Sequence, residues 1–332
     1  MPKFKAIITD YITDELEPEK THLGDLADLV ALDAHSDEEL RARVTDADVL
    51  MVYHNTTISA ETIRGLRHCR LIIRCGVGFD NVDIRVAREH QIPVANVPDY
   101  GTEEVADSAV GMALSLARGI HQANSLLRQA PARWDYRIVA PLPRLRGRIF
   151  GIVGLGRIGT AAARRAAALG MDVIYYDPYK QDGYDKANGI RRVDRLDELL
   201  AQSYIVSLHC PATDETRGMI DAAAIAAMPR GSILINTARG VILDTAALPD
   251  ALASGHLRGA GVDVLPCEPP ATNDPLTAAW RDPQHPAHHR LLINPHSAFY
   301  CEEGLLEIRV KAATNCRNAL TSQPIRNIIN GV

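Results

Sequence analysis

The sequence lacks a long apolar run, a Cys-x-x-Cys pair and an excess of positive charge. The first absence argues against a membrane-spanning helix, which needs about 20 mostly apolar residues. The six scattered cysteines favour free thiols in a reducing compartment over a disulfide framework or a zinc site, so we expect a cytoplasmic protein without a metal. A net charge of -5 gives no electrostatic footprint for nucleic acid or a membrane surface. The start, Met1–Asp10, has no signal-peptide pattern.

The length and the pattern of apolar runs predict two α/β domains. At 332 residues, the chain exceeds the size at which one hydrophobic core usually stops growing. Apolar runs alternating with helical stretches indicate a parallel sheet covered on both faces, and six such runs after a glycine-rich turn predict a doubly wound Rossmann nucleotide-binding domain. The expected strands are Ile149–Val153, Asp172–Tyr176, Tyr204–Leu208, Ser232–Asn236, Gly261–Leu265 and Leu291–Asn294, and the expected helices are near Ile158–Leu169, Thr216–Met228 and Asp244–Ser254.

The ends of the chain predict a smaller, flavodoxin-like α/β domain that would hold a substrate. Its expected strands are Lys5–Thr9, Val49–Tyr53, Leu71–Cys75 and Pro93–Val97. A long helix over Thr102–Leu127, with Thr102 as its N-cap, would lead into the larger domain, and a last helix over Glu303–Leu320 would return. Pro141–Arg148 and Pro269–Arg290 are expected to be loops. The predicted domains are therefore residues 1–100 with 299–332, and residues 101–298.

A glycine fingerprint lies between the first strand and first helix of the larger domain. It consists of Gly154, Gly156 and Gly159 in the order G-x-G-x-x-G. Such glycines let the backbone approach a pyrophosphate at the helix N-terminus, where N–H groups and the helix dipole favour anions. Asp177 ends the next strand, where a carboxylate accepts hydrogen bonds from ribose hydroxyls and repels a 2′-phosphate. The pattern predicts NAD rather than NADP.

Three polar residues follow successive strands of this domain. Arg239 follows the fourth strand, Glu268 the fifth and His296 the sixth. Hydride transfer at an alcohol carbon needs a base for the hydroxyl proton, and histidine suits that task near neutral pH. A carboxylate beside it orients the ring and favours its charged form, while a guanidinium binds a substrate carboxylate. Taken singly, each of these residue types is more often part of a surface ion pair than of a catalytic site.

The order of these motifs resembles that of the D-isomer-specific 2-hydroxyacid dehydrogenase family over essentially the whole chain. The resemblance implies that Arg239, Glu268 and His296 are the catalytic residues, that Asp263 supports the nicotinamide, and that the backbone at Val77 and Gly78 helps to hold the substrate carboxylate. The motifs that carry it are Gly76–Asn81, Gly154–Gly159, Asn236–Gly240, Asp263 with Glu268-Pro269, and Pro295-His296. Further candidates for cofactor contacts are Arg157, Ile158, His209, Pro211, Thr216, Thr237, Ala238 and Val105, and for substrate contacts His54, Phe299 and Arg239.

Within the family, the chain looks most like the C-terminal binding protein branch. The similar segments are Tyr53-His54, Tyr176–Tyr179 and Pro295–Tyr300, although that branch carries tryptophan where this chain has Phe299. Members of the branch act as NAD(H)-responsive corepressors, so an NAD(H)-sensing, protein-binding dimer with little turnover is the alternative to an enzyme. The resemblance also suggests a homodimer.

The identity of the substrate stays open at this stage. A dehydrogenase for formate or phosphite is a third possibility, but Glu268 stands where the resemblance leads us to expect an amide for formate. No arginine lies near Tyr53–Asn55, and we expect no regulatory extension after the last helix, so a phosphorylated substrate is disfavoured. His285, His288 and His289 lack a carboxylate or cysteine to complete a metal site, so we expect a solvated loop there.

Overall fold

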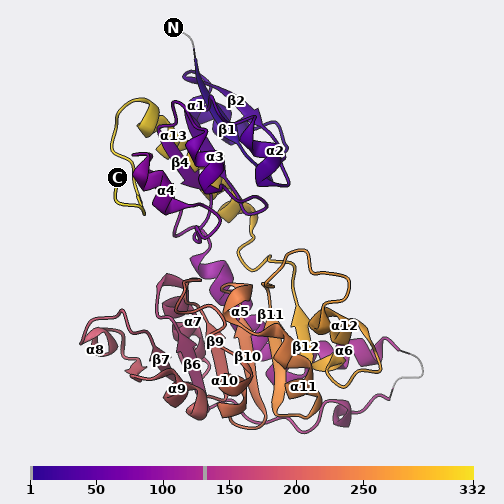
Figure 1. Cartoon of the computed structure of the whole chain (residues 1–332). Helices are drawn as coiled ribbons and strands as arrows, with labels where there is room; N and C mark the ends of the chain where they lie inside the picture. Colours follow the sequence, from indigo (N-terminus) through magenta and orange to yellow (C-terminus); the bar gives the residue numbers. More distant parts are fainter. Residues whose placement is uncertain (1–2, 130–132) are drawn as a thin grey trace. The chain divides into compact units, whose positions relative to one another are not determined.

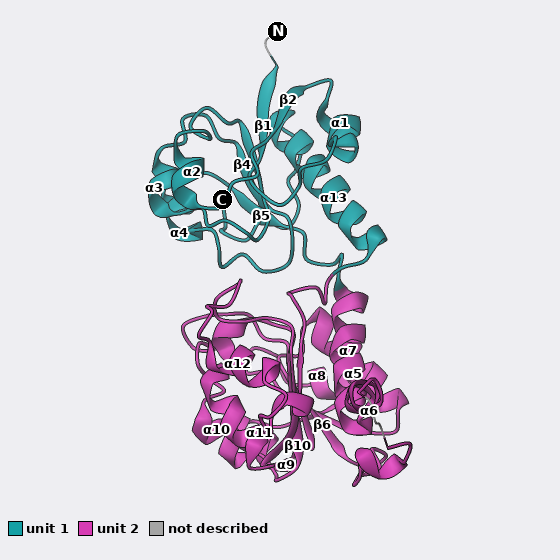
Figure 2. Cartoon of the chain, turned by 90° about the vertical axis from the view of Figure 1, so that its right-hand side faces the viewer, with its two compact units in different colours: residues 1–101, 300–332 teal, residues 102–299 magenta. Residues whose placement is uncertain are grey.

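The protein is described by a computed structural model that covers residues 3–129 and 133–332 (Figure 1). It divides into two compact units (Figure 2). Unit 1 comprises Met1–Gly101 and Tyr300–Val332, and unit 2 comprises Thr102–Phe299. Each unit is built around its own parallel sheet.

The sheet of unit 1 has five strands in the residues that the structure describes. Their order is β2-β1-β3-β4-β5, and all neighbouring pairs are parallel. This is the flavodoxin-like order, so the predicted fold of the smaller domain is confirmed. The sequence did not reveal β2, because its side chains are mostly half-exposed and form no buried apolar run. The strands are β1 (Phe4–Ile8), β2 (Ala27–Ala31), β3 (Val49–Val52), β4 (Leu71–Arg74) and β5 (Val94–Asn96).

Helices cover both faces of this sheet (Figure 2). On one face, α2, α3 and α4 pack against the strands through a core that includes Leu40, Ile63 and Val86. On the other face, α1 and α13 lie side by side, and Arg309 of α13 donates to both carboxylate oxygens of the buried Glu19 of α1, at 2.8 and 2.6 Å. The helices are α1 (Glu17–Leu23), α2 (Asp37–Arg41), α3 (Ala60–Arg64), α4 (Ile84–Glu89) and α13 (Glu302–Leu320).

The sheet of unit 2 has the Rossmann order. Its strands lie in the order β12-β11-β10-β9-β6-β7-β8, and all pairs are parallel, which confirms the predicted doubly wound fold. The described part of the unit has seven strands where the sequence predicted six. The additional strand, β8, has only two residues, both arginines, and so gives no apolar signal. The strands are β6 (Ile149–Val153), β7 (Asp172–Tyr176), β8 (Arg191–Arg192), β9 (Ile205–Leu208), β10 (Ser232–Asn236), β11 (Leu257–Val262) and β12 (Leu291–Ile293).

Helices lie on both faces of this sheet (Figure 2), and each face has its own hydrophobic core. One is built from α5 and α7, whose alanines allow close packing on the strands. The other is built from α9, α10, α11 and α12. The helices are α5 (Thr102–Arg118), α6 (Ile120–Leu127), α7 (Arg157–Ala168), α8 (Tyr184–Asn188), α9 (Leu196–Gln202), α10 (Ala222–Ala227), α11 (Leu248–Ala253) and α12 (Pro275–Arg281), with 3-10 turns at Tyr136–Ile138, Gly240–Ile242, Thr245–Ala247 and His288–Arg290.

Several predicted helix boundaries are wrong for local reasons. The long helix predicted over Thr102–Leu127 is two helices, because Gly119 has a φ of 63° and a Cβ there would lie 2.9 Å from the Cβ of Val139. Helix α5 already includes Thr102, which is therefore not the cap residue. Helix α10 starts late because Asp221 caps it by accepting a hydrogen bond from the N–H of Ala224.

Two further differences concern the residues around the predicted site. The fifth strand is Leu257–Val262 rather than Gly261–Leu265, and its glycines hide the apolar pattern because each faces a side chain of α5. A Cβ at Gly259 would lie 2.7 Å from Leu116 Cδ2. The stretch Pro269–Arg290, expected to be a loop, contains α12, which Asp274 caps ahead of a proline in the first turn.

Candidate active site

His296 and Glu268 are in direct contact. His296 follows β12, and its Nδ1 lies 2.7 Å from Glu268 Oε2, with exposed side-chain fractions of 24% and 34%. Glu268 is itself oriented by the backbone N–H of Leu265, which donates to its Oε1 at 2.7 Å. His296 has a φ of 52°, a left-handed conformation that is costly for a residue other than glycine and is often found at functional sites.

The buried carboxylate of Asp263 holds the segment that carries His296. Asp263 follows β11, and its backbone carbonyl accepts a hydrogen bond from the N–H of His296 at 2.8 Å. Its side chain accepts hydrogen bonds from the N–H groups of Ser297 and Ala298 at 2.9–3.1 Å. Burial raises the pKa of Asp263, while the two N–H donors and His296 oppose that shift. Asp263 therefore fixes the backbone on both sides of the imidazole.

Arg239 lies at the end of β10, the strand next to β11. Its Nη1 donates to the carbonyl of Ala238 at 2.8 Å, and the side chain of Asn236 donates to the carbonyl of Arg239 at 2.9 Å. The next residue, Gly240, packs directly on the loop that leads to Glu268, since a Cβ there would lie 1.9 Å from the carbonyl carbon of Leu265. Arg239, Glu268 and His296 thus follow three adjacent strands at the carboxyl edge of one sheet.

The glycine fingerprint forms the turn between β6 and α7. Gly154 has a φ of 90°, and a Cβ there would lie 2.7 Å from the backbone N of Cys210. A Cβ at Gly159 would lie 2.1 Å from the carbonyl oxygen of Gly154. Gly156 differs, because its φ is -78° and no described atom lies within 4 Å of a Cβ placed there. The fold requires the first and last glycines, whereas Gly156 leaves open space at the start of α7, beside Arg157 and Ile158.

Asp177 directly follows β7, beside this turn. It accepts hydrogen bonds from the N–H of Leu155 at 2.9 Å and from the N–H of Tyr179 at 3.1 Å. Its side chain is 12% exposed, and Lys180 Nζ lies 3.9 Å from it. Lys180 was not among the residues expected from the sequence, because no pattern of apolar residues marks its position.

Two of the other cofactor candidates carry buried polar atoms for which the described part of the chain offers no hydrogen-bond partner. They are His209 Nδ1 and Thr237 Oγ1, at the carboxyl ends of β9 and β10. Burial lowers the pKa of His209 to about 4, so its ring is neutral near pH 7. Buried polar groups normally have partners, so these atoms fit contact with a ligand. Together with the open space at Gly156, they show that the residues present suit a dinucleotide.

The remaining candidates in unit 2 lie on several elements. Thr216 donates from its Oγ1 to the carbonyl of Pro211 at 2.6 Å and thereby closes the loop after β9. Ala238 packs against the core at the end of β10, and Val105 is buried in the first turns of α5. Phe299 lies edge-on to His296, with ring centroids 6.3 Å apart.

The substrate candidates of unit 1 lie in two loops at the carboxyl edge of its sheet. The carbonyl of Val77, next to Gly78, accepts a hydrogen bond from Asn96 Nδ2 at 2.7 Å. His54 follows β3, and its ring lies 4.6 Å from that of Tyr11. Two side chains that were not among the sequence-based candidates, Asp10 and Asn81, hold this second loop.

The buried carboxylate of Asp10 is the first of these, and it accepts hydrogen bonds from the N–H groups of Tyr53 and Asn55 at 3.0 and 2.7 Å. The side chain of Asn81 is the second, and it donates to the carbonyls of Tyr53 and Thr56. An acidic residue directly after a buried strand was the available signal for Asp10.

No helix among residues 3–129 and 133–332 is long and apolar enough to cross a membrane. In the same residues, no group of three or more histidine, cysteine or acidic side chains is arranged to hold a metal ion.

The chain is similar to known dehydrogenases. Residues 110–298 match the family described as the D-isomer specific 2-hydroxyacid dehydrogenase, NAD binding domain. The chain is 32% identical over 326 residues to the D-3-phosphoglycerate dehydrogenase of Methanocaldococcus jannaschii and 34% identical over 320 residues to that of Mycobacterium bovis, which covers 98% and 96% of this chain. It spans only 59% and 58% of the length of these two relatives.

A solved structure extends the comparison over the whole chain. The D-lactate dehydrogenase of Aquifex aeolicus, complexed with NAD and lactic acid, has a TM-score of 0.87 at 27% identity, and the match covers 99% of this chain and 100% of that one. The chain therefore belongs to the D-isomer-specific 2-hydroxyacid dehydrogenase family and contains its NAD-binding domain.

Proposed function

We propose that the protein is an NAD-dependent dehydrogenase that transfers a hydride between NAD(H) and C2 of a small D-2-hydroxy acid or 2-keto acid. The observation that carries the proposal is the 2.7 Å contact between His296 and Glu268, at strand ends adjacent to that of Arg239. An imidazole oriented by a carboxylate is a general acid–base, and a guanidinium beside it binds a carboxylate.

The protein's own residues handle the proton and position the substrate. When bound, the nicotinamide supplies or accepts the hydride. Because Nδ1 of His296 contacts Glu268, Nε2 is the atom that exchanges a proton with the substrate oxygen. It gives the proton to the carbonyl oxygen in reduction and takes it from the hydroxyl in oxidation. Glu268 orients the ring through this contact, and Arg239 binds the substrate carboxylate in either direction.

The cofactor would lie at the carboxyl edge of the sheet of unit 2. The pyrophosphate would approach Gly156 and the first N–H groups of α7, and Asp177 would accept hydrogen bonds from the ribose hydroxyls. A 2′-phosphate would meet the negative charge of Asp177, so we propose NAD rather than NADP. His209 and Thr237, with their orphaned atoms, are the further residues proposed to contact it.

The substrate is proposed to be small and to contact Val77, Gly78, His54 and Phe299. The two relatives named as phosphoglycerate dehydrogenases do not settle the substrate, because each is much longer than this chain. We also propose that the protein is a homodimer of the cytoplasm. The free state of all six cysteines is consistent with that compartment.

A substrate screen tests the proposed activity. NADH oxidation is followed by absorbance with glyoxylate, pyruvate, hydroxypyruvate, phenylpyruvate and branched 2-keto acids, and NADPH replaces NADH in a parallel series. We expect turnover with at least one keto acid and a preference for NADH. No turnover with any of them, together with stable capture of a protein partner, would instead favour the corepressor-like alternative.

A further inference from the structure

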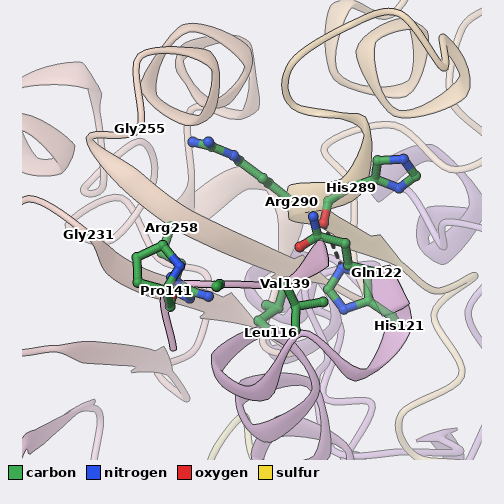
Figure 3. A pocket seen from close by; sticks show the side chains of 11 residues that line it. Leu116, His121, Gln122, Val139, Pro141, Gly231, Gly255, Arg258, His289 and Arg290 are labelled. Carbon is green, nitrogen blue, oxygen red and sulfur yellow. Dashed lines mark hydrogen bonds between the residues drawn. The ribbon is translucent and has the colours of Figure 1, made fainter. Parts of the chain in front are cut away.

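Unit 2 contains a cavity on the edge of its sheet opposite to the candidate active site. Its volume is about 230 Å³, and the residues that line it include Gly231, Gly255 and Arg290, which lie just before β10, β11 and β12 (Figure 3). Since all strands are parallel, these positions lie at the amino edge, whereas Arg239, Glu268 and His296 follow the same strands. A cavity of about 150 Å³ is enough for a benzene ring, so this one has room for a small molecule.

Three guanidinium groups converge on this cavity. Arg258 and Arg290 line it, and Arg230 joins them, because a Cβ added at Gly255 would lie 3.2 Å from Arg290 Nη1 and 3.5 Å from Arg230 Nη2. Burial and then the repulsion of Arg258 and Arg230 lower the pKa of Arg290. The three guanidinium groups are therefore close enough to repel one another electrostatically.

The hydrogen bonds within the protein use only a small part of these groups. Arg230 donates to the carbonyl of Ser254 and Arg290 to that of Leu252, so both satisfy the last turn of α11. Arg258 donates from Nη1 to the carbonyl of Pro141 at 2.8 Å, while its Nε is buried and finds no partner in the described chain. Each guanidinium has five N–H donors. Capping of α11 therefore explains the positions of two arginines but leaves most of their donors unassigned.

The charge of the cluster is also uncompensated. Among the described residues, no carboxylate lies within salt-bridge distance of Arg230, Arg258 or Arg290. Other arginines of the same unit, such as Arg165 and Arg192, do pair with carboxylates. The two histidines of the lining, His121 and His289, add no negative charge. A bound anion would neutralise the positive charge of the three arginines and accept hydrogen bonds from their remaining N–H donors.

We propose that this cavity is a binding site for a small oxyanion with at least two negative charges. Phosphoryl and polycarboxylate ligands share this chemistry, and both accept the bidentate hydrogen bonds that guanidinium groups offer. The site is separate from the proposed catalytic and cofactor residues and does not depend on their assignment.

Calorimetric titration of inorganic phosphate into the full-length protein tests the proposal. Saturating NAD and oxamate fill the proposed cofactor and substrate sites, and ionic strength is held constant with chloride. We expect one phosphate per chain. Because Arg230 is exposed, Arg230→Gln should fold normally and weaken binding at least about tenfold, the effect of losing one charge-assisted hydrogen bond. Arg258→Gln should do the same.

The matched control is Arg281→Gln, which removes the same charge from an exposed position on α12. It should leave phosphate binding unchanged. A second titration with citrate distinguishes the two ligand classes by which anion binds more tightly. If neither anion binds, or if Arg230→Gln and Arg258→Gln bind phosphate as tightly as the wild type, the proposal is overturned. Unchanged far-ultraviolet circular dichroism and NAD affinity show that each variant is folded.

Discussion

At the scale of single residues, Gly156 distinguishes what the fold requires from what a bound cofactor requires. Gly156 has an ordinary φ and no described atom near its Cβ position, so nothing in the protein itself requires glycine there. We expect Gly156→Ala to keep the free energy of unfolding of the apoprotein and to weaken NAD binding by at least about tenfold, because the methyl group would occupy the space of the pyrophosphate. Thermal unfolding and NADH fluorescence titration measure the two effects.

The control for this variant is Gly111→Ala on the exposed face of α5, where a Cβ also meets no described atom. It should raise helix stability by about 0.5–1 kcal/mol and leave NAD affinity unchanged. Equal NAD affinity in Gly156→Ala and the wild type would count against the proposed position of the cofactor.

The neutral ring of His209 predicts an acid sensitivity of folding. Its pKa is about 4 in the folded protein, whereas an unfolded histidine titrates near 6.5. Below about 6.5 the unfolded chain binds a proton that the folded protein does not, so the free energy of unfolding falls as the pH drops towards 4. In His209→Gln this contribution is absent, and the loss of stability between pH 7 and pH 5 should be smaller. Denaturant unfolding at both pH values measures it, with His68→Gln, at an exposed site, as the control.

The site residues that could be predicted from the sequence are those that follow an apolar run directly. Asp177, Arg239 and His296 each come soon after a buried strand, and the structure places His296 against Glu268. The roles of Asp10 and Asn81 could not be predicted in this way, although Asp10 also follows a buried strand. Asp10 reaches backbone groups more than 40 residues away, and such pairings leave no local pattern.

At the scale of elements, the strands with an apolar run were predictable, including β5 and β12 at sheet edges, and the strands without one were not. Strands β2 and β8 have exposed or charged side chains, and β11 contains glycines because α5 approaches it closely. These close approaches depend on segments far apart in the sequence. Helix α12 was missed for a different reason, since its local signal is a cap and a proline rather than an apolar period.

Gly240 packs closely on the loop after β11, so a larger residue there should disturb both segments. A Cβ at Gly240 would lie 1.9 Å from the backbone of Leu265, which no side-chain rotation relieves. Gly240→Ala should therefore lower the free energy of unfolding by about 1–3 kcal/mol and shift the neighbouring Arg239. Denaturant unfolding and kcat/KM report the two losses, with Gly111→Ala as the matched control. A fully active, equally stable Gly240→Ala protein would contradict the close packing.

At the scale of the whole molecule, unit 2 exposes apolar side chains that suit a contact between two copies of the chain. Ile120, Trp134 and Tyr136 have exposed fractions of 59%, 90% and 82%. Exposed apolar groups gathered in one segment often mark an interface. We expect light scattering at micromolar concentration to give about twice the chain mass of 36.2 kDa, and Trp134→Ala to shift the equilibrium towards the monomer. A wild-type monomer would rule out the proposed homodimer.

The pH dependence of keto-acid reduction tests the central claim most directly. It is measured with the best substrate of the screen for the wild type, Glu268→Gln and His296→Ala. If His296 donates the proton in reduction and Glu268 acts on its ring through their 2.7 Å contact, the pH profile of reduction changes in Glu268→Gln. His296→Ala should lose about a hundred- to ten-thousandfold in turnover while it still binds NADH. Near-normal turnover of His296→Ala with an unchanged pH profile would contradict the account.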